Sequence, residues 1–413
     1  AGKQMNRLLQ GDVGSGKTVI ALMSMLMGLD NGFQACMMAP TEILATQHYL
    51  SLVEMLEDMP VTIKLLTGSS KKKEREEISE MLINGTLNIL VGTHALIEDN
   101  VIFNNLGMVV IDEQHRFGVA QRAKLWFKVR PLPHVLVMTA TPIPRTLAMS
   151  VHGELDVSVI DELPAGRKPI RTVHKDESYR GEAMEFIRTQ IAAGRQAYFV
   201  YPLIEESAAL DLQDLMQGYE TVTDFFPLPK YQVSMVHGRM KPAEKESEMQ
   251  RFKKGITNIM VATTVIEVGV NVPNASVMLI ESSERFGLSQ LHQLRGRVGR
   301  GADQSYCILM TKGNINFIAK QRIKAMTSTT DGFVISKTDL QLRGPGDVLG
   351  TRQSGLPDFK LLDLVADEDI IAEAKNAAHY ILEKDPDLKH PENEALMNYL
   401  MRHQSDNFWG RVS

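Results

Sequence analysis

The chain contains little cysteine and few aromatic residues: two cysteines in 413 residues, with an aromatic fraction of 6%. Two thiols exclude a disulfide framework. Both Cys36 and Cys307 stand in apolar, strand-like runs, so we expect buried free thiols and a reducing compartment. The 11 histidines show no zinc-like spacing to the cysteines, and no structural metal is expected. There is also no apolar run long enough to span a membrane, and no visible signal peptide.

An excess of positive charge is missing as well. Lysine and arginine number 45 against 50 acidic residues, which gives a formal net charge of −5. This balance excludes a chain that is basic throughout, so a nucleic-acid site would have to be a local basic channel. The apolar fraction of 44% and the charged fraction of 23% are those of an ordinary globular protein. The length allows two or three domains with large cores.

Short apolar runs alternate with amphipathic helical patterns over most of the chain. In the first half this pattern predicts strands over 35–39, 61–65, 88–91, 108–111 and 135–139, with helices over 42–56 and 71–83. It restarts with strands over 196–200, 232–236, 259–262, 277–280 and 306–310, and helices over 180–193 and 242–253. The Pro- and Gly-containing segment 162–172 between them is predicted to be a linker. The fold class is therefore α/β, with two tandem domains built on parallel sheets and a helical C-terminal part.

The most informative motif is residues 11–18, Gly-Asp-Val-Gly-Ser-Gly-Lys-Thr. It fits the phosphate-binding loop pattern between an apolar run and a helical one. The loop backbone and the helix N-terminus would bind phosphates, Lys17 would reach the β- and γ-phosphates, and Thr18 would ligate Mg²⁺. The alternative is a glycine-rich turn that fits by accident. Nucleotide contacts are expected from Gly11, Gly14, Ser15, Gly16, Lys17 and Thr18.

A second motif is the acidic pair Asp112-Glu113, directly after an apolar strand. In open α/β sheets ligands bind at the carboxyl ends of the strands, so this pair should face the nucleotide. We expect Asp112 to hold Mg²⁺ and Glu113 to orient or deprotonate the attacking water. An acidic turn after a strand is the plainer alternative.

Two further motifs follow strands or precede the C-terminal part. Thr139-Ala140-Thr141-Pro142 ends a predicted strand, where hydroxyls could sense the γ-phosphate, although Thr-Pro also commonly terminates strands. Residues 290–301 crowd Arg295, Arg297 and Arg300 among glycines. Such a cluster could supply arginine fingers to an ATP site, and its alternatives are a solvated basic helix face or a patch that contacts DNA phosphates.

Taken in order, these motifs resemble those of superfamily 2 helicases and translocases, in which two RecA-like domains enclose ATP. The further motifs that carry the resemblance are Pro40-Thr41-Glu42, Thr67-Gly68, Gly92-Thr93-His94, Thr263–Gly269 and Gln293–Arg300. It implies that Gln293, Arg297 and Arg300 complete the ATP site, together with Gly269 and Asn271. It implies contacts to the DNA backbone from Thr41, Thr67, Gly68, Thr93, Thr263 and Thr264.

A narrower resemblance covers essentially the whole chain. Residues 112–118 and 139–146 look like those of the RecG helicases and the transcription-repair coupling factors. Residues 200–207, 344–346 and 351–355 favour the RecG family, which remodels replication forks and branched recombination intermediates. In that family the element at 340–355 turns ATP-driven domain motion into movement along duplex DNA; without the family, it reads as a surface loop. The implied coupling residues are His115, Thr139, Thr141, Arg343, Arg352 and Gln353.

The resemblance also sets expectations about what the chain lacks. We expect a fragment, because an adenine-recognition motif and an N-terminal wedge domain that grips the branch point would precede Ala1 in this family. Asn271 stands where many relatives carry aspartate; its amide can still hydrogen-bond a ribose hydroxyl. The expected domains are 1–163 and 164–315, both RecA-like, and 316–413 for the translocation motif and C-terminal extension.

The sequence thus predicts an ATP- and Mg²⁺-dependent DNA motor, monomeric and bacterial cytoplasmic, whose partner is branched or duplex DNA and not a membrane. Two rivals remain. One is a translocase of the transcription-repair coupling type, which would carry a polymerase-binding module upstream. The other is a protein-translocating ATPase on the same paired domains, which would show no stimulation by DNA.

Overall fold

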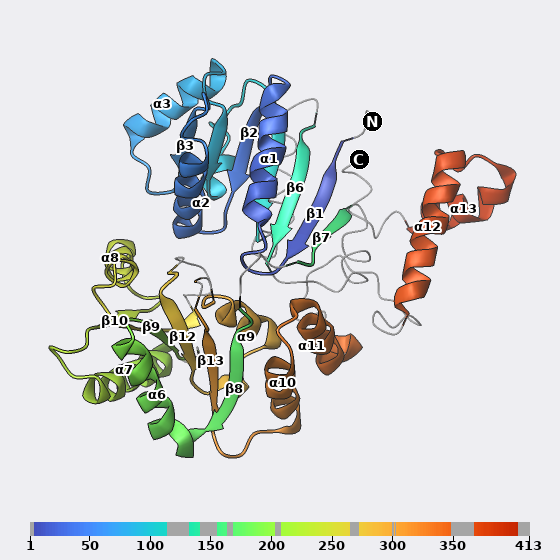
Figure 1. Ribbon diagram of the computed structural model, residues 1–413. Coiled ribbons are helices and arrows are strands. Elements are labelled where there is room, and N and C mark those ends of the chain that lie inside the picture. The colour runs from blue at the N-terminus through green and yellow to red at the C-terminus, as the bar shows by residue number, and fades with distance from the viewer. Residues whose placement is uncertain are drawn as a thin grey trace. The chain divides into compact units, whose positions relative to one another are not determined.

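The structure, a computed structural model, describes residues 4–113, 132–140, 155–162, 168–202, 208–264, 272–299, 301, 303–347 and 367–403. For 208–213, 242, 343–347, 368 and 372 only the backbone is described. The chain divides into two compact units, Ala1–Pro142 with Ser158–Asp339, and Ile143–Val157 with Leu340–Ser413. Both β-sheets, drawn in Figure 1, belong in all but a few residues to the first unit.

The first sheet has the strand order β3-β4-β2-β5-β6-β1-β7. Its described strands are β1 (Asn6–Gly11), β2 (Gln34–Met38), β3 (Ile63–Leu66), β4 (Ile89–Gly92), β5 (Leu106–Asp112), β6 (His134–Thr139) and β7 (Asp156–Ile160). The pairs from β3 across to β1 are parallel. Gln10 lies opposite Thr139 and Asp112 opposite Met138, so the carboxyl ends of β1, β5 and β6 share one edge. This edge carries the phosphate loop and the acidic pair.

Helices pack on this sheet through small and apolar side chains. They are α1 (Lys17–Asp30), α2 (Glu42–Met55) and α3 (Lys72–Ile83), with the short η1 (His94–Ile97) after β4. Ala21 and Met25 of α1 and Ala45 and Leu52 of α2 are fully buried in one core with alternate residues of the strands. The alternate residues of the central strands are buried on the opposite face, as is typical of a parallel sheet covered on both sides; they include Leu8, Cys36, Leu90, Val109 and Val135.

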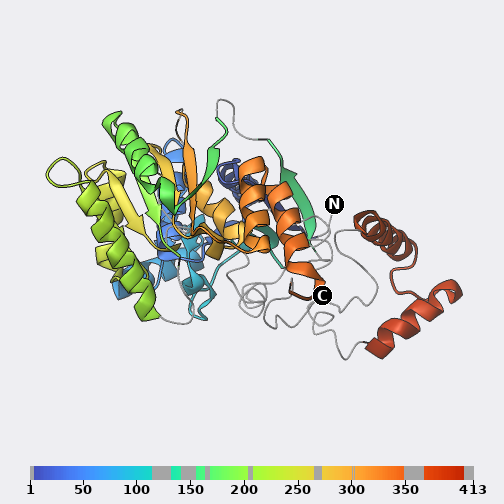
Figure 2. The ribbon, with the colours of Figure 1, turned by 90° about the horizontal axis from the view of Figure 1, so that it is seen from below.

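The second sheet has the order β10-β11-β9-β12-β13-β8, and each pair of neighbouring strands in it is parallel. Its strands are β8 (Arg171–Asp176), β9 (Gln196–Val200), β10 (Val233–Val236), β11 (Ile259–Ala262), β12 (Ala275–Ile280) and β13 (Tyr306–Thr311). Its helices are η3 (Glu177–Tyr179), α6 (Arg180–Ala192), α7 (Ala208–Phe225), α8 (Pro242–Lys253), η5 (Ser283–Arg285) and α9 (Leu288–Arg295). Figure 2 shows α6 and α7 along one side of the strands, where they share a core with them.

The α/β fold with two parallel sheets is confirmed, and each predicted strand is present with its ends within two residues of the expected ones. Two strands were missed. β7 had not been predicted, and β8 begins at Arg171, inside the predicted linker, which is therefore wrong at its C-terminal end. Both strands lie at sheet edges and lack a continuous apolar run: β7 alternates polar and apolar residues over most of its length, and β8 is mostly polar.

The two sheets are built alike down to buried polar contacts. Gln34 opens β2, and its side-chain amide donates to the carbonyls of Leu82 and Leu87 at 3.1 and 2.8 Å. Gln196 opens β9 and donates in the same way to Phe252 and Thr257, at 2.7 Å each. Each amide joins a central strand to the end of a helix and the loop after it. Positions after β3 and β4 therefore have structural counterparts after β10 and β11.

The remaining described elements are helical. They are α10 (Phe317–Ser328), α11 (Gly332–Asp347), α12 (Glu368–Lys384), η6 (Pro391–Asn393) and α13 (Glu394–His403). None of the helices in the described part of the chain is long and apolar enough to cross a membrane. The helical character predicted beyond about residue 311 is confirmed, whereas the domain limits at 163 and 315 stay predictions.

Candidate nucleotide and nucleic-acid site

The phosphate loop joins β1 to α1 through two glycines in the left-handed region. Gly14 has φ +79° and Gly16, the N-cap of α1, has φ +96°, conformations that favour glycine. Lys17 opens the helix, and its Nζ donates to the carbonyls of Gly11 and Asp12 at 2.7 and 2.8 Å. The Ser15 hydroxyl is buried without a hydrogen-bond partner. The loop thus presents a cation, a helix N-terminus and an unpaired hydroxyl, which together suit a phosphate group.

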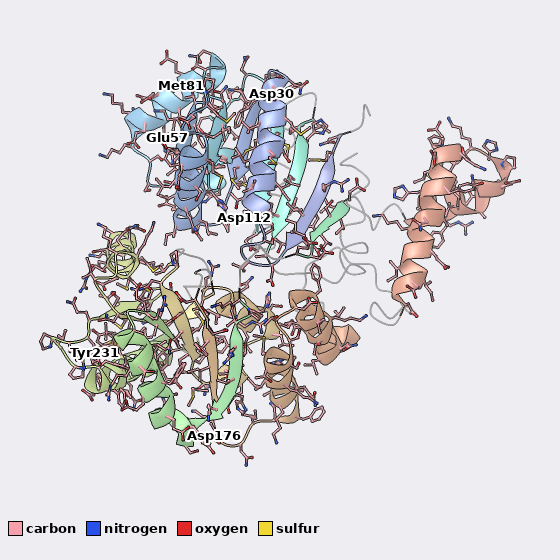
Figure 3. The ribbon with its side chains drawn as sticks, in the orientation of Figure 1. Asp30, Glu57, Met81, Asp112, Asp176 and Tyr231 are labelled. Carbon is pink, nitrogen blue, oxygen red and sulfur yellow. The ribbon has the colours of Figure 1, made fainter. Side chains whose placement is uncertain are left out.

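The acidic pair stands at the end of β5, on the same sheet edge; Figure 3 labels Asp112 there. Burial alone would raise the pKa of Asp112, but the hydrogen bond from His48 and the charge of Lys17 outweigh it and lower this pKa. Burial, together with the neighbouring Asp112 charge, raises the pKa of Glu113 to about 7. The Glu113 Oε1 accepts from the Ala140 amide at 3.1 Å. The pKa values of two adjacent carboxyls are therefore shifted in opposite directions, and a pKa of about 7 lets Glu113 take up or release a proton near neutral pH.

A histidine from α2 contacts the first of these carboxylates. The Nε2 of His48 lies 2.8 Å from the Oδ2 of Asp112, and the two side chains are 13% and 12% exposed. Because Asp112 is ionised and can only accept, the hydrogen belongs on Nε2. The sequence reasoning missed His48, since nothing in the sequence pairs residues 64 positions apart.

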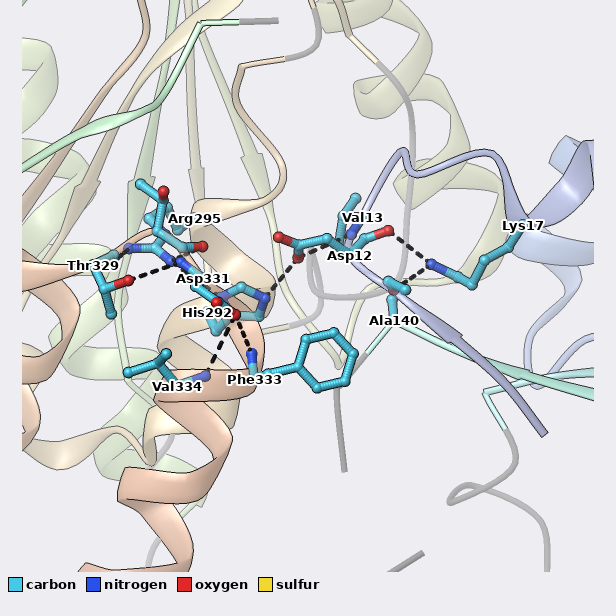
Figure 4. A network of polar contacts seen from close by, with 12 residues as sticks. Asp12, Val13, Lys17, Ala140, His292, Arg295, Thr329, Asp331, Phe333 and Val334 are labelled. Carbon is cyan, nitrogen blue, oxygen red and sulfur yellow. Dashed lines mark hydrogen bonds and ion pairs between the residues drawn. The ribbon is translucent and has the colours of Figure 1, made fainter. Parts of the chain in front are cut away.

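On the side of the second sheet, α9 faces the phosphate loop through a buried polar network, shown in Figure 4. The Nε2 of His292 donates to Asp12 Oδ1 at 2.8 Å, and Nδ1 of the same ring accepts from Arg295 Nη2 at 3.2 Å. Arg295 also donates to the carbonyls of Met326, Thr329 and Thr330 at 2.8–3.1 Å. Asp331, the next residue, caps α11 by accepting from the Phe333 amide at 2.8 Å. Hydrogen bonds therefore connect the phosphate loop to Thr330, which directly precedes the Asp331 cap of α11.

Burial would raise the pKa of Asp12, but the hydrogen bonds that its carboxylate accepts, first of all the one from His292, outweigh this effect and lower the pKa. The Asp12 carboxylate also accepts from the Val13 amide at 3.1 Å. A second observation shows how closely α9 lies to the phosphate loop: a Cβ on Gly296 would come within 2.9 Å of Val13 Cγ2. The end of α9 thus packs directly on the phosphate loop, and a side chain at position 296 would force Val13 to shift.

The predicted motif 290–301 is helical only in its first half, because α9 ends at Arg295 with Gly296 as its C-cap. Arg297 therefore lies beyond the helix. Arg297 lies close enough to Glu113 for its charge to lower the pKa of that carboxyl, against the larger effect of burial. Gln293 is buried within α9. Arg295, predicted only as one of a cluster, is a fully buried structural residue.

The predicted nucleic-acid residues lie at the starts of loops after the strands or at a helix N-terminus. Thr41 caps α2 by accepting from the Leu44 amide at 3.3 Å, and Thr67 and Gly68 follow β3. Thr93 follows β4, and Thr263 follows β11 at the corresponding position, with Thr264 next to it. The hydroxyls of Thr93 and Thr263 are both buried, and neither has a hydrogen-bond partner. The two threonines thus occupy corresponding positions in the two domains, and their contacts to nucleic acid stay a prediction.

Several predicted residues lie outside the described part of the chain: His115, Thr141, Gly269, Asn271, Arg300, Arg352 and Gln353. Arg343 lies in α11, of which only the backbone is described there. Thr139 is the buried last residue of β6.

One residue that had not been singled out is His237, which follows β10 and is the structural counterpart of Thr67. Its Nδ1 is buried and has no hydrogen-bond partner. The repeated topology is the signal that could have found it.

Comparisons with known proteins agree with this geometry. Three family models match: "DEAD/DEAH box helicase" over residues 1–150, "Helicase conserved C-terminal domain" over 185–302, and "ATP-dependent DNA helicase RecG, domain 3, C-terminal" over 329–413. A phosphate loop and acidic pair on one parallel sheet, opposed by α9 of a second, define the class of helicases with two RecA-like domains.

The ATP-dependent DNA helicase RecG of Synechocystis sp. is 54% identical over 389 residues, which are 94% of this chain and 46% of that protein. RecG of Bacillus subtilis is 50% identical, over 97% of this chain and 58% of that protein. The solved structure of RecG bound to a three-way DNA junction is 43% identical, with a TM-score of 0.73, and the match covers 90% of this chain and 48% of that one. The chain belongs to the RecG family, and it spans about half the length of the curated relatives it matches.

Proposed function

We propose that this chain is the motor portion of an ATP-dependent DNA helicase and duplex translocase that remodels forks and branched recombination intermediates. The observation that carries the proposal is the meeting of the phosphate loop and acidic pair of one domain with Gly296 and Arg297 of the other. A RecA-like domain that supplies arginine to a nucleotide held by its neighbour can couple hydrolysis to domain movement.

Lys17 and the loop amides would hold the phosphates of ATP, and Ser15 would find there the partner its hydroxyl lacks. Asp112 and Thr18 offer the hard oxygen donors that Mg²⁺ prefers, and the lowered pKa of Asp112 keeps its carboxylate ionised, so these residues fit the ion. When bound, Mg²⁺ neutralises charge on the phosphates. Glu113 would accept the proton of the attacking water, and Arg297, with Arg300, would stabilise the charge that develops on the γ-phosphate.

DNA would follow the ends of the strands in both domains. Thr93 and Thr263 offer a hydroxyl each at equivalent positions, and Thr41, Thr67, Gly68 and Thr264 lie at neighbouring strand and helix ends. Such contacts position a strand through its phosphates without reading its sequence. The solved RecG relative is bound to a three-way DNA junction, which supports branched DNA as the substrate. We propose that residues outside these 413 bind the branch point. We also propose that the protein is a monomer in the bacterial cytoplasm.

The test is steady-state ATP hydrolysis without nucleic acid, with linear duplex and with a three-way junction. We expect stimulation by DNA, and loss of nucleotide binding in Lys17→Ala, because removing the loop cation leaves the phosphates without their main charge partner. A matched control is Lys64→Ala, whose partner is the exposed Glu77. An absence of DNA stimulation while ATP is still hydrolysed would overturn the proposal and favour a protein-translocating ATPase.

A further inference from the structure

His48 connects the ATP site to the part of the first domain where nucleic acid is expected. Its ring lies on α2 and contacts Asp112 at the end of β5, at 2.8 Å. The side chains of both residues are nearly buried, so the contact is shielded from water and holds the carboxylate in one orientation. The roles given above to the ATP-site residues leave His48 without one.

The amino end of α2 is fastened to the loop after β3. Thr41 is the N-cap, and both carboxylate oxygens of Glu42 accept from Ser69, one from its amide and one from its hydroxyl, at 3.0 Å each. The Ser69 hydroxyl lies 2.9 Å from Thr67 Oγ1. Two segments with predicted nucleic-acid contacts, at Thr41 and at Thr67-Gly68, are therefore joined through the first turn of α2.

Thr41 and His48 are seven residues apart, which is about two helical turns, so they lie on the same side of α2. A helix is stiff along its axis, and a displacement of its first turn is carried to the second and third. Ala45, between them, is fully buried against the sheet. A strand that binds at the amino end of α2 would thereby act on His48 and, through it, on Asp112.

We propose that His48 is a positioning residue, which orients the Asp112 carboxylate for ATP hydrolysis and makes that orientation depend on nucleic acid bound at the amino end of α2. This inference rests on the proposed function. Partners that orient a metal-binding carboxylate or histidine commonly change metal affinity or activity by about 10- to 100-fold when they are removed.

The experiment compares His48→Ala, which removes the donor, with His48→Gln, whose side-chain amide NH₂ can replace the ring Nε2–H. Glu54→Ala, an exposed position on the same helix, is the control. For each variant three quantities are measured: kcat and KM for ATP with and without duplex DNA, the Mg²⁺ concentration for half-maximal binding of a fluorescent ADP analogue, and the melting temperature.

We expect His48→Ala to lower the DNA-stimulated kcat by about 10-fold or more and to raise the half-maximal Mg²⁺ concentration by a similar factor, with little change in KM. His48→Gln should restore most of both quantities, and the control should behave as wild type. A His48→Ala variant with wild-type kcat and Mg²⁺ dependence would overturn the proposal. An equal loss of basal and DNA-stimulated rates, without rescue by glutamine, would overturn the link to nucleic acid.

The two proposals fail in different ways. If wild-type protein shows no DNA stimulation, the proposed function and with it the link to nucleic acid are wrong. The Mg²⁺ dependence of ADP-analogue binding then still decides whether His48 orients Asp112, because that measurement needs neither DNA nor hydrolysis.

Discussion

Glu113 combines an unusual backbone conformation with an unusual carboxyl group. Its φ is +51°, a region that side-chain-bearing residues rarely adopt, and it follows Asp112 without a break. Burial and the Asp112 charge raise the pKa of Glu113 to about 7. Strain and a shifted pKa at one residue are typical of functional sites, where neighbouring structure maintains what the residue alone would avoid.

A pH-dependent stability follows for the protein free of metal and nucleotide. Between about pH 4.5 and pH 7 the folded state holds a proton on Glu113 that the unfolded state has lost, so the stability falls as pH rises through this window. Glu113→Gln removes this effect and keeps the acceptor for the Ala140 amide. We expect the variant to be more stable than wild type above pH 7, by about 3 kcal/mol at most, and to lose that advantage toward pH 4.5. Urea unfolding in EDTA across this range measures it.

Glu54→Gln, at an exposed position, is the control for that series. A constant difference in stability between Glu113→Gln and wild type from pH 4.5 to pH 8 would show that Glu113 titrates normally.

For single residues, the sequence predicts the position in the site well when a local motif contains the residue. Lys17 and Asp112 lie where the motifs put them, at the carboxyl edge of one sheet. His48 and Asp12 could not be assigned their contacts, because each pairs with a residue far along the chain. Contacts of that kind depend on the packing of whole elements, and one sequence carries no sign of them.

Among the elements, α9 is joined to the end of α10 and the segment that follows it by the side chain of one arginine. Arg295 is 2% exposed and donates to three backbone carbonyls and to His292. Arg295→Lys keeps the charge but loses the fork of donors, so at least one buried carbonyl is left unpaired. We expect a loss of stability on the order of 3 kcal/mol, measured by urea unfolding.

Arg251→Lys is a suitable comparison, since Arg251 pairs with Glu248 across an exposed helix surface and should change stability little. An unchanged unfolding midpoint for Arg295→Lys would mean that the ammonium group replaces the guanidinium, and that the fork is not needed.

The elements also show where pattern reasoning stops. The buried central strands of both sheets were predicted closely, because continuous apolar runs mark them. The edge strands β7 and β8 carry exposed polar residues and were not recognised. The position of α9 was not predicted, and the packing of its C-cap residue Gly296 on Val13 can be seen only in three dimensions.

In the whole molecule, the repeated topology gives Thr93 and Thr263 equivalent environments. If both hydroxyls donate to DNA phosphates, Thr93→Val and Thr263→Val should each weaken duplex binding by roughly 5-fold, because each loses about 1 kcal/mol. The same changes remove a buried unpaired hydroxyl, so stability should stay equal or rise by about 1 kcal/mol. Fluorescence anisotropy with labelled duplex and thermal melting provide the two measurements.

A loss of DNA affinity without a loss of stability distinguishes this prediction from general damage to the fold. Thr221→Val, exposed on α7, is the control. A fall in stability together with unchanged DNA affinity in both variants would assign the two hydroxyls to packing.

The two cysteines provide two separate probes of local opening in the protein. Cys36 lies in β2 and Cys307 in β13, both fully buried, so each sheet contains one thiol, and the chain has no others. A thiol reagent can modify either residue only when its own sheet opens. The two labelling rates, separated by mass spectrometry of the peptides, would therefore report how often each RecA-like domain opens, and whether bound nucleotide makes the two domains open together.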